Sequence, residues 1–264
     1  MFELKHITKI FSRGTPDEKR ALNDLSMILN DGDFVTVIGG NGAGKSTMQN
    51  VISGAQTPEE GQVLLDGVDV TGLPEYKRAR YLGRVYQDPM IGTAANMQIE
   101  ENLALANRRG KKHTLRPMIT KTERVQFKAA LQELGLGLEE RLTAKVGTLS
   151  GGQRQALTLL MATLQKPRLL LLDEHTAALD PKTAAKVMGL TDRIVRENRL
   201  TTLMITHNMR DAIEYGDRLI MLHEGRIILD IAGERKQKLT VEDLLRQFTL
   251  ASGEEFTSDR AILG

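Results

Sequence analysis

The stretch FVTVIGGNGAGKST, residues 34–47, constrains the fold of this 264-residue chain more than any other segment. It opens with an uninterrupted apolar and β-branched run, which is typical of a strand buried inside a parallel sheet. The residues that follow match G-x-x-x-x-G-K-[ST], and the stretch after them is compatible with a helix. A strand, a glycine-rich loop and a helix in this order predict a loop whose backbone N–H groups surround phosphate oxygens.

The side chains of this loop suit a polyphosphate ligand. We expect the Lys45 ammonium to reach the β- and γ-phosphates and the Ser46 hydroxyl to ligate Mg²⁺. The helix that begins near Lys45 would aim the positive end of its dipole at the same anion. A glycine-rich turn with a solvated lysine is the alternative, but it gives no reason for the buried strand before the loop. The predicted phosphate loop comprises Gly39, Gly40, Asn41, Gly42, Ala43, Gly44, Lys45, Ser46 and Thr47.

A second predicted strand, RLLLLD, ends in a pair of carboxylates, Asp173 and Glu174. The carboxyl end of a buried strand is where an open α/β sheet places its ligand chemistry. We expect Asp173 to hold Mg²⁺ through water and Glu174 to act as the general base that polarises an attacking water. Alone, a solvated acidic turn would explain this pair equally well. Together with the phosphate loop, the pair indicates hydrolysis.

Three single side chains are weaker candidates. Gln87, in VYQDP, could ligate Mg²⁺ or orient water, although a surface glutamine is usually only solvated. His207 closes the predicted strand TTLMIT and could donate a hydrogen bond to a γ-phosphate, with a capping or core histidine as the alternative. Phe11, upstream of the phosphate loop, could stack on adenine or belong to the core.

The first two thirds of the chain change from strand patterns to helix patterns. Strands are predicted at residues 2–8, 25–29 and 61–67, and helical periodicity extends from about Ile99 to Leu134. The apolar residues that mostly fit helical spacing in that stretch are Val125, Phe127, Ala130, Leu131 and Leu134. A basic run at residues 108–116 is either a solvated loop or a contact with lipid phosphates or an acidic partner.

The final third alternates strands with helices, which implies a parallel sheet covered by helices. The residues after Asp230 fit one or two further helices. The predicted elements are strands at 168–173 and 201–207, helices at 181–198 and 209–216, and a hairpin at 218–230.

Composition limits the class of protein. With 41% hydrophobic and 27% charged residues, the chain is an ordinary globular one, and its net charge of +2 gives no argument for a nucleic-acid partner. The absence of cysteine excludes disulfides and thiolate metal sites. No signal peptide and no apolar run of about 20 residues is found, so we expect a soluble, cytoplasmic protein that relies on a partner for any work at a membrane.

The motif LSGGQRQ, residues 149–155, places two glycines at a predicted helix start with no reactive group beside them. Taken alone, Ser150 is an ordinary helix N-cap. Taken in order with the phosphate loop, the glutamine of VYQDP, LLLLDE, TAALD and the histidine of MITHN, the motif resembles the nucleotide-binding subunit of an ATP-binding cassette (ABC) transporter. The resemblance covers nearly the whole chain.

The resemblance implies an α/β fold with a P-loop NTPase (RecA-like) core containing a parallel sheet, an N-terminal antiparallel β subdomain and a helical subdomain at about residues 90–165. The ATPase domain would span residues 1–230, followed by a helical tail at 231–264. The implied cofactors are ATP and Mg²⁺, with Ser46, Gln87 and Asp173 at the metal.

The resemblance also implies a head-to-tail dimer, for which a homodimer is plausible because both Glu174 and His207 are present. Each ATP would lie between the phosphate loop of one subunit and the LSGGQ motif of the other. On this basis Lys45, Gln87, Glu174 and His207 serve catalysis. The residues implied to contact nucleotide outside the phosphate loop are Phe11, Ser150, Gly151, Gly152, Gln153 and Asp180.

The expected function is to power transport through separate membrane permease subunits. Resemblance to importer cassettes suggests import of a small solute such as an amino acid, with an extracytoplasmic substrate-binding protein. The subunit would then sit on the inner face of the cell membrane. An exporter cassette with separate permeases, a soluble non-transport ABC ATPase and a P-loop kinase are the alternatives.

Overall fold

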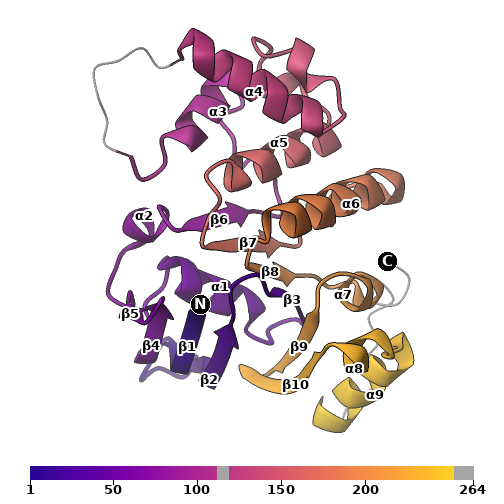
Figure 1. Ribbon diagram of the computed structural model, residues 1–264. Coiled ribbons are helices and arrows are strands. Elements are labelled where there is room, and N and C mark those ends of the chain that lie inside the picture. The colour runs from indigo at the N-terminus through magenta and orange to yellow at the C-terminus, as the bar shows by residue number, and fades with distance from the viewer. Residues whose placement is uncertain (112–118, 253–264) are drawn as a thin grey trace. The chain divides into compact units, whose positions relative to one another are not determined.

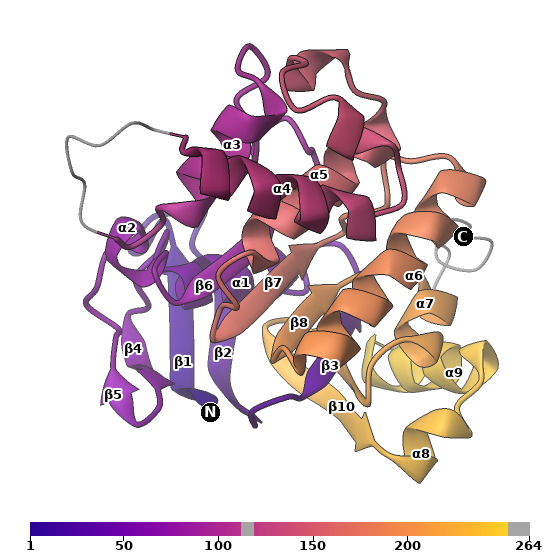
Figure 2. The ribbon, with the colours of Figure 1, turned by 45° about the horizontal axis from the view of Figure 1, so that its top comes forward.

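The computed structural model describes residues 1–111 and 119–252. The chain divides into two compact units, which are treated one at a time (Figures 1 and 2). Unit 1 comprises Met1–Arg78 and Arg199–Gly264, and unit 2 comprises Ala79–Asn198. Part of the basic run at 108–116 and the end of the tail at 231–264 lie outside the described residues.

Unit 1 contains an antiparallel sheet with the strand order β2-β1-β4-β5 (Figure 1). Its central strand β1 pairs with both β2 and β4, so that Phe2 lies opposite Leu29 on one side and Leu65 on the other. These strands confirm the predicted N-terminal antiparallel β subdomain. The bounds are β1 (Phe2–Phe11), β2 (Lys19–Leu29), β4 (Glu60–Leu65) and β5 (Val68–Asp69).

A second group of strands in unit 1 has the order β10-β9-β3-β8. Strand β3 runs parallel to both β8 and β9, and β10 pairs with β9 as the predicted hairpin. The first five residues of β3 are buried, as the apolar run predicts. The bounds are β3 (Phe34–Gly39), β8 (Thr202–Ile205), β9 (Arg218–His223) and β10 (Arg226–Ala232).

The helices of unit 1 include the one that follows the phosphate loop and two from the tail. Leu244 in the tail is fully buried in a cluster with Ile38, Met209 and Met221, so the end of the chain packs on the core of this unit. The bounds are α1 (Lys45–Ser53), α2 (Glu75–Arg78), α7 (Met209–Glu214), α8 (Glu234–Gln237) and α9 (Val241–Ser252).

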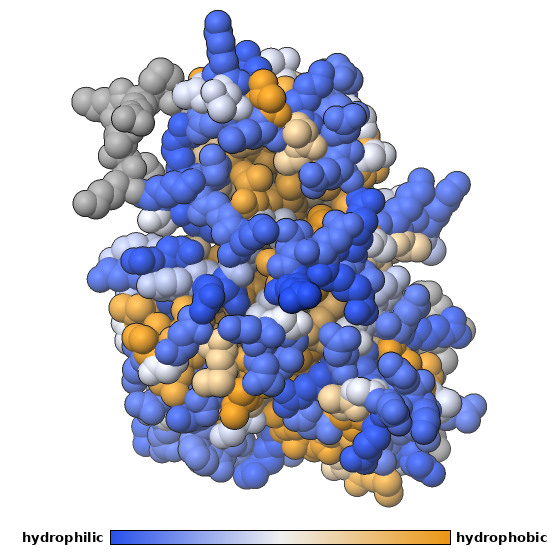
Figure 3. Space-filling view, in the orientation of Figure 1, coloured by the Kyte–Doolittle hydropathy of each residue, from blue (hydrophilic) through white to orange (hydrophobic). Residues whose placement is uncertain are grey.

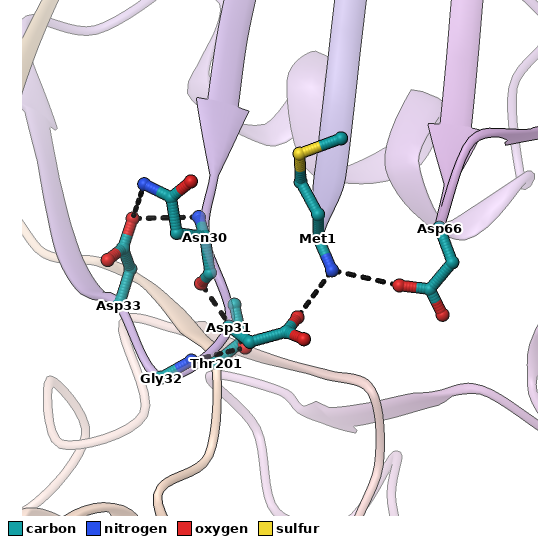
Figure 4. A network of polar contacts seen from close by, with 7 residues as sticks. All are labelled: Met1, Asn30, Asp31, Gly32, Asp33, Asp66 and Thr201. Atoms are coloured by element: carbon teal, nitrogen blue, oxygen red, sulfur yellow. Dashed lines mark hydrogen bonds and ion pairs between the residues drawn. The ribbon is translucent and has the colours of Figure 1, made fainter.

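A polar network joins several segments of unit 1 at the start of the chain (Figure 4). The amino group of Met1 donates to Asp66 Oδ1 at 2.8 Å and also contacts Asp31. In the turn between β2 and β3, Gly32 N–H donates to Thr201 Oγ1 at 2.9 Å, just before β8. The network thereby fixes the turn that leads into the strand of the phosphate loop.

Unit 2 contains two parallel strands and a set of helices (Figure 2). The predicted helix at residues 181–198 is present with those bounds as α6. Within the 99–134 stretch, where the sequence predicts helical periodicity, the described residues form the two helices α3 and α4. The bounds are β6 (Leu82–Val85), β7 (Leu169–Asp173), α3 (Ile99–Asn107), α4 (Lys121–Glu133), α5 (Gly151–Thr163), α6 (Pro181–Asn198) and the 3₁₀ turns η1 (Leu138–Glu140) and η2 (Val146–Thr148).

The apolar face of α4 is narrower than its sequence suggests. Phe127, Leu131 and Leu134 are buried, and their spacing of four and three residues places them on one side of the helix. Val125, which was among the residues that mostly fit helical spacing, is 70% exposed and lies outside the buried face. Two residues of helix turn a side chain by about 200°, which directs Val125 away from Phe127.

The surface shown in Figure 3 is largely hydrophilic, with hydrophobic side chains in small groups. Over the described residues, no helix combines the length and the apolar character needed to cross a membrane.

Candidate functional site

In unit 1 the phosphate loop connects β3 to α1. Its last glycine, Gly44, is the N-cap of α1 and has a left-handed backbone with φ of 102°. A Cβ atom at this position would lie 2.5 Å from the carbonyl oxygen of Ala21, so only glycine fits. Because Gly44 has no side chain to cap the helix, the first N–H groups of α1 can donate to an anion.

Lys45 is buried, and its ammonium bends back over the loop. Its Nζ donates to the carbonyl oxygens of Gly39 at 2.7 Å and Gly40 at 3.0 Å. The neighbouring Ser46 is exposed at the start of the helix. This arrangement holds a cation beside the free helix end, as a bound phosphate requires.

The turn between β9 and β10 supports the loop from outside it. Gly225 N–H donates to the carbonyl oxygen of Ala43 at 3.0 Å. A Cβ atom at Gly225 would lie 2.6 Å from the carbonyl oxygen of Ala21, the same atom that Gly44 approaches. Sequence reasoning treated Gly225 only as part of a hairpin.

His207 follows β8, directly beside β3 in unit 1. The preceding residue, Thr206, donates its N–H to the carbonyl oxygen of Val37 at 3.1 Å, and Val37 lies two residues before the loop. His207 is partly exposed. Burial and then Glu214 raise the pKa of Asp211, and the nearby His207 opposes this shift. Unit 1 thus brings His207 and the phosphate loop to the carboxyl ends of adjacent parallel strands.

Phe11 lies at the end of β1, opposite Lys19 on β2. It is partly exposed and is not one of the buried core residues, and Lys9 Nζ lies 5.5 Å from its ring centroid. Lys19 is a cation that the sequence reasoning missed, because nothing in its local pattern marks it. A Cβ atom at Gly42 would lie 3.3 Å from Lys19 Nζ, which places this ammonium beside the loop.

In unit 2, β7 delivers Asp173 and Glu174 at its carboxyl end. Asp173 Oδ2 lies 3.9 Å from a guanidinium nitrogen of Arg84 on the neighbouring strand β6. Glu174 has a left-handed backbone with φ of 44°. Such a conformation costs a non-glycine residue about 1–3 kcal/mol and is concentrated at functional sites.

His175 follows Glu174 but has a structural setting. It is completely buried, and burial lowers its pKa to about 4. Its Nε2 lies 3.0 Å from Thr191 Oγ1 on α6. The ring is therefore neutral near pH 7 and fixes the turn after the carboxylates.

The LSGGQ motif begins α5 with a complete capping box. Ser150 Oγ accepts from Gln153 N–H at 3.3 Å, and Gln153 Oε1 accepts from Ser150 N–H at 3.2 Å. A Cβ atom at Gly152 would lie 2.2 Å from Thr183 Cγ2, so glycine here allows α5 and α6 to approach each other closely. Beside the motif lies an open cavity of about 440 Å³, also bordered by Lys186.

Gln87 and Asp180 occupy exposed positions in the same unit. Asp180 Oδ1 accepts from Thr183 N–H at 3.1 Å, as a cap at the start of α6 does. Hydrogen bonds from Thr183 lower the pKa of Asp180, so this side chain is an anion.

Two residues that directly follow the LSGGQ motif connect α5 to the segment around Gln87. Gln155 is fully buried, and its Nε2 donates to the carbonyl oxygen of Tyr86 at 3.3 Å. Arg154 donates to the carbonyl oxygen of Gly147 at 3.0 Å and contacts Met90 Sδ at 2.7 Å. The available signal was a polar residue, Gln155, at the start of an otherwise apolar helix.

The predicted residues therefore fall into two sets, and each set is gathered within one unit. Unit 1 holds the phosphate loop, Phe11 and His207. Unit 2 contains Gln87, Ser150, Gly151, Gly152, Gln153, Asp173, Glu174 and Asp180. Among the described residues, no group of three or more His, Cys, Asp or Glu could hold a metal ion by itself.

Comparison with known proteins supports the same family. The model of the ABC transporter family matches residues 22–177, more than half of the chain. The chain is 47% identical over 252 residues to the tyrosine transport ATP-binding protein of Clostridioides difficile (strain R20291), covering 95% of this chain and 100% of that protein. It is 33% identical over 234 residues to the methionine import ATP-binding protein of Corynebacterium efficiens, covering 86% of this chain and 61% of that one.

A solved dimeric structure of a post-hydrolysis ATP-binding cassette, bound to ADP and Pi, is also similar. It has 29% sequence identity and a TM-score of 0.74, and the alignment covers 88% of this chain and 98% of that one. The likeness confirms the α/β P-loop NTPase fold and the predicted ATPase activity. The chain belongs to the ABC transporter family, in which it is an ATP-binding subunit that hydrolyses ATP.

Proposed function

We propose that this subunit powers the import of tyrosine or a closely similar amino acid through separate membrane permease subunits. The observation that carries the proposal is the 47% identity to the tyrosine transport ATP-binding protein, which extends over the whole of that protein. Export through separate permeases is the alternative. The relative named for methionine import favours the inward direction.

In the proposed site of unit 1, the loop from Gly39 to Thr47 binds the triphosphate of ATP. Its support is the uncapped start of α1 at Gly44 and the cation at Lys45. Lys45 exchanges its loop carbonyls for phosphate oxygens when nucleotide enters. Phe11 stacks on adenine in this proposal, which its partial exposure supports.

Mg²⁺ fits the donor set, because Ser46 offers a hydroxyl, Gln87 an amide oxygen and Asp173 a carboxylate. Mg²⁺ usually binds one or two protein carboxylates together with substrate phosphates and waters. When bound, it neutralises charge on the phosphates. A site of this kind requires no three-carboxylate cluster.

Glu174 is the proposed general base. Its carboxylate accepts a proton from water as the water attacks the γ-phosphorus, and the bond from that phosphorus to the β,γ-bridging oxygen breaks to give ADP and phosphate. His207 donates a hydrogen bond to a γ-phosphate oxygen. The left-handed backbone at Glu174 supports a role in which its side-chain direction matters.

The LSGGQ motif is proposed to act on the ATP held by a second copy of this chain. Ser150, Gly151 and Gly152 would donate to the γ-phosphate, Gln153 would hold the motif, and Asp180 would cross the dimer interface. An anionic γ-phosphate is a better acceptor than the Ser150 hydroxyl that now caps α5. Binding of ATP at this helix therefore depends on dimer closure.

The movement that closes the dimer is proposed to be transmitted to the permease through the segment after Gln87. Met90 and Ile91 there are 44% and 66% exposed, which offers an apolar surface to a membrane partner. The subunit would then work on the inner face of the cell membrane, together with an extracytoplasmic binding protein.

The test is reconstitution of the subunit with the membrane proteins that co-purify with it. We expect ATP inside proteoliposomes whose cassettes face the lumen to drive uptake of labelled tyrosine from the outside. With inverted proteoliposomes, ATP added outside should drive uptake only if the system exports. Glu174→Gln subunits provide the inactive control. Transport of methionine or leucine with no transport of tyrosine would contradict the proposed substrate. Transport away from the cassette side of the membrane would establish export.

A further inference from the structure

The C-terminal helix α9 approaches the phosphate loop within unit 1. It packs on a cluster of buried residues that contains Ile38, the residue immediately before Gly39. Leu244 on α9 is fully buried in this cluster, and Phe248, one turn further along, packs against its edge. The tail is therefore continuous with the core from which the loop emerges.

The ring of Phe248 lies against the loop itself. A Cβ atom at Gly40 would lie 3.3 Å from Phe248 Cζ and 3.4 Å from its Cε2. The ring of Phe248 therefore borders the space that a side chain at Gly40 would fill. Any side chain at position 40 would compete with the ring for this space.

The opposite wall of this contact is the end of β9. His223 meets Phe248 edge-to-face, with ring centroids 5.6 Å apart and an interplanar angle of 83°. A Cβ atom at Gly39 would lie 2.4 Å from the carbonyl oxygen of Leu222, the residue before His223. Of the first two loop glycines, Gly39 therefore lies beside β9 and Gly40 lies beside α9.

The confined backbone also organises the catalytic cation. The carbonyl oxygen of Gly40 accepts from Lys45 Nζ at 3.0 Å and from Ala43 N–H at 3.2 Å. Displacement of Gly40 would consequently move both the lysine and the turn of the loop. Phe248 lies beside this backbone and offers it no polar atom.

The segment before α9 is anchored to unit 1 by a buried cation. Lys236 on α8 is 3% exposed, and its ammonium donates to the carbonyl oxygens of Ile213 at 3.1 Å and Gly216 at 2.8 Å, with a further contact to Tyr215. These carbonyls lie at the end of α7, where a lysine is a favourable cap. The anchor fixes where α9 begins and hence where Phe248 lies.

We propose that Phe248 is a positioning residue for nucleotide binding: its ring holds Gly40 so that the loop N–H groups and Lys45 converge on phosphate. The proposal rests on the proposed role of the Gly39–Thr47 loop. A loop held in its binding conformation does not have to be ordered by the ligand, and this raises affinity. The C-terminal helix is thereby part of the nucleotide-binding apparatus, although it supplies no group to the nucleotide.

Titration with a fluorescent ADP analogue tests the proposal. We expect Phe248→Ala to weaken binding about tenfold, whereas Phe248→Leu, which keeps apolar volume, weakens it less. Leu250→Ala is the matched control, since Leu250 is 74% exposed on the same helix and should bind as the wild type does. Thermal unfolding of each variant verifies that the chain remains folded at the assay temperature.

Lys45→Ala distinguishes failure of the phosphate loop from failure of the Phe248 contact. If Lys45→Ala binds normally, the proposed phosphate loop is wrong; if Lys45→Ala loses binding while Phe248→Ala and Phe248→Leu match the wild type, only the role of Phe248 is wrong. A folded Phe248→Ala variant with unchanged affinity overturns the proposal.

A spectroscopic readout does not depend on deleting the ring. The chain has no tryptophan, so Phe248→Trp introduces a single indole at the contact with Gly40. We expect its emission to change on addition of ATP or ADP with a midpoint at the binding constant, whereas Leu250→Trp on the exposed face stays constant. An indole at position 248 that is silent to saturating nucleotide would refute the contact as a part of the binding apparatus.

Discussion

Helices α1 and α5 both have glycine at or beside their first residue, and both are proposed to bind phosphate oxygens, yet their N-caps differ. The N-cap of α1 is Gly44, with a left-handed backbone and no side chain. The N-cap of α5 is Ser150, with an extended backbone and a hydroxyl that accepts from Gln153 N–H. One helix start is open to a ligand, and the other has already satisfied a donor by itself.

The difference indicates two modes of phosphate recognition. An N-cap hydroxyl contributes about 1 kcal/mol, and a phosphate at α5 must replace this contribution before it adds any affinity. At α1 no such exchange is needed, although Lys45 must release its loop carbonyls. The phosphate loop should therefore bind nucleotide in a single subunit, whereas α5 should engage it only in a closed dimer.

The most severe test separates binding in unit 1 from chemistry in unit 2. Glu174→Gln should lower ATP turnover by about 10²- to 10⁴-fold, because the general base is lost. Nucleotide affinity should persist, and an ATP-bound dimer should accumulate on size-exclusion chromatography. The control is Glu197→Gln, at an exposed position on α6. Wild-type turnover in Glu174→Gln would rule out the general-base assignment.

The open start of α1 is tested by removing its cation. Lys45→Ala should lower ATP turnover by about 10²- to 10³-fold, because an electrostatic contact to the phosphates is lost. Isothermal titration with ADP measures the binding part of this loss in the single subunit. Lys121→Ala, at an exposed position in α4, is the control. If Lys45→Ala hydrolysed ATP as fast as Lys121→Ala, the start of α1 would not be a phosphate site that differs from the start of α5.

The capped start of α5 is tested by two substitutions of Ser150, one that removes the N-cap and one that keeps it but adds a negative charge. Ser150→Ala should cost about 1 kcal/mol of unfolding free energy. It should also lower ATP turnover roughly tenfold, because a hydrogen bond to charged phosphate is lost. Ser150→Asp should keep the cap and the stability but repel phosphate, so its turnover should fall further. Monomer affinity for ADP should stay constant in both variants.

Thr120→Ala is the matched control for Ser150→Ala. Thr120 caps α4 with an equivalent box, accepting from Glu123 N–H at 3.2 Å. We expect a similar loss of stability with full ATP turnover. If Thr120→Ala lowers turnover as much as Ser150→Ala does, the effect at Ser150 is one of stability alone.

Acid should lower the stability of the chain through His175 in unit 2 and should have no specific effect on the phosphate loop. Burial lowers the pKa of His175 to about 4, below its ordinary value of 6.5, so between these values the unfolded chain binds more protons. The unfolding free energy should then fall by about 2 kcal/mol between pH 7 and pH 5. In unit 1, burial and Glu214 raise the pKa of Asp211. The contribution of Asp211 to the unfolding free energy therefore increases as the pH falls, opposite to that of His175.

His175→Gln isolates this contribution, because the amide can still bond Thr191 but does not titrate. Thermal unfolding at pH 7 and pH 5 should show a smaller acid loss in the variant than in the wild type. An identical acid loss in both would mean that His175 does not set the pH dependence.

The elements around each motif could be predicted because their signals are local. The apolar run before Gly39 and the span of α6 from Pro181 to Asn198 are present as predicted, since burial and capping patterns lie within the segments themselves. Ser150 was also predicted as an N-cap, from its place at the start of a helix, and it is one. The exposure of Val125 could not be predicted, because a loose helical period does not distinguish the two sides of a helix.

The contacts that position the motifs could not be predicted, because they join residues far apart in the sequence. The contact of Phe248 with Gly40 and the bond from Gln155 to Tyr86 both depend on the complete fold of a unit. Neither Phe248 nor Lys19 has a distinctive neighbour in the sequence. Only packing in three dimensions reveals that they approach nucleotide-binding segments.

The close packing of Gly225 affects how a map of tolerated substitutions should be interpreted. A Cβ atom there would strike the carbonyl of Ala21, and its N–H bonds the carbonyl of Ala43, so every other amino acid should fail in a saturation-mutagenesis screen for transport. Gly189 on α6, where a Cβ atom would meet nothing within 4 Å, should accept alanine. A tolerance map would therefore mark Gly225 as strongly as a nucleotide ligand, although its intolerance arises from the hairpin on which the loop rests.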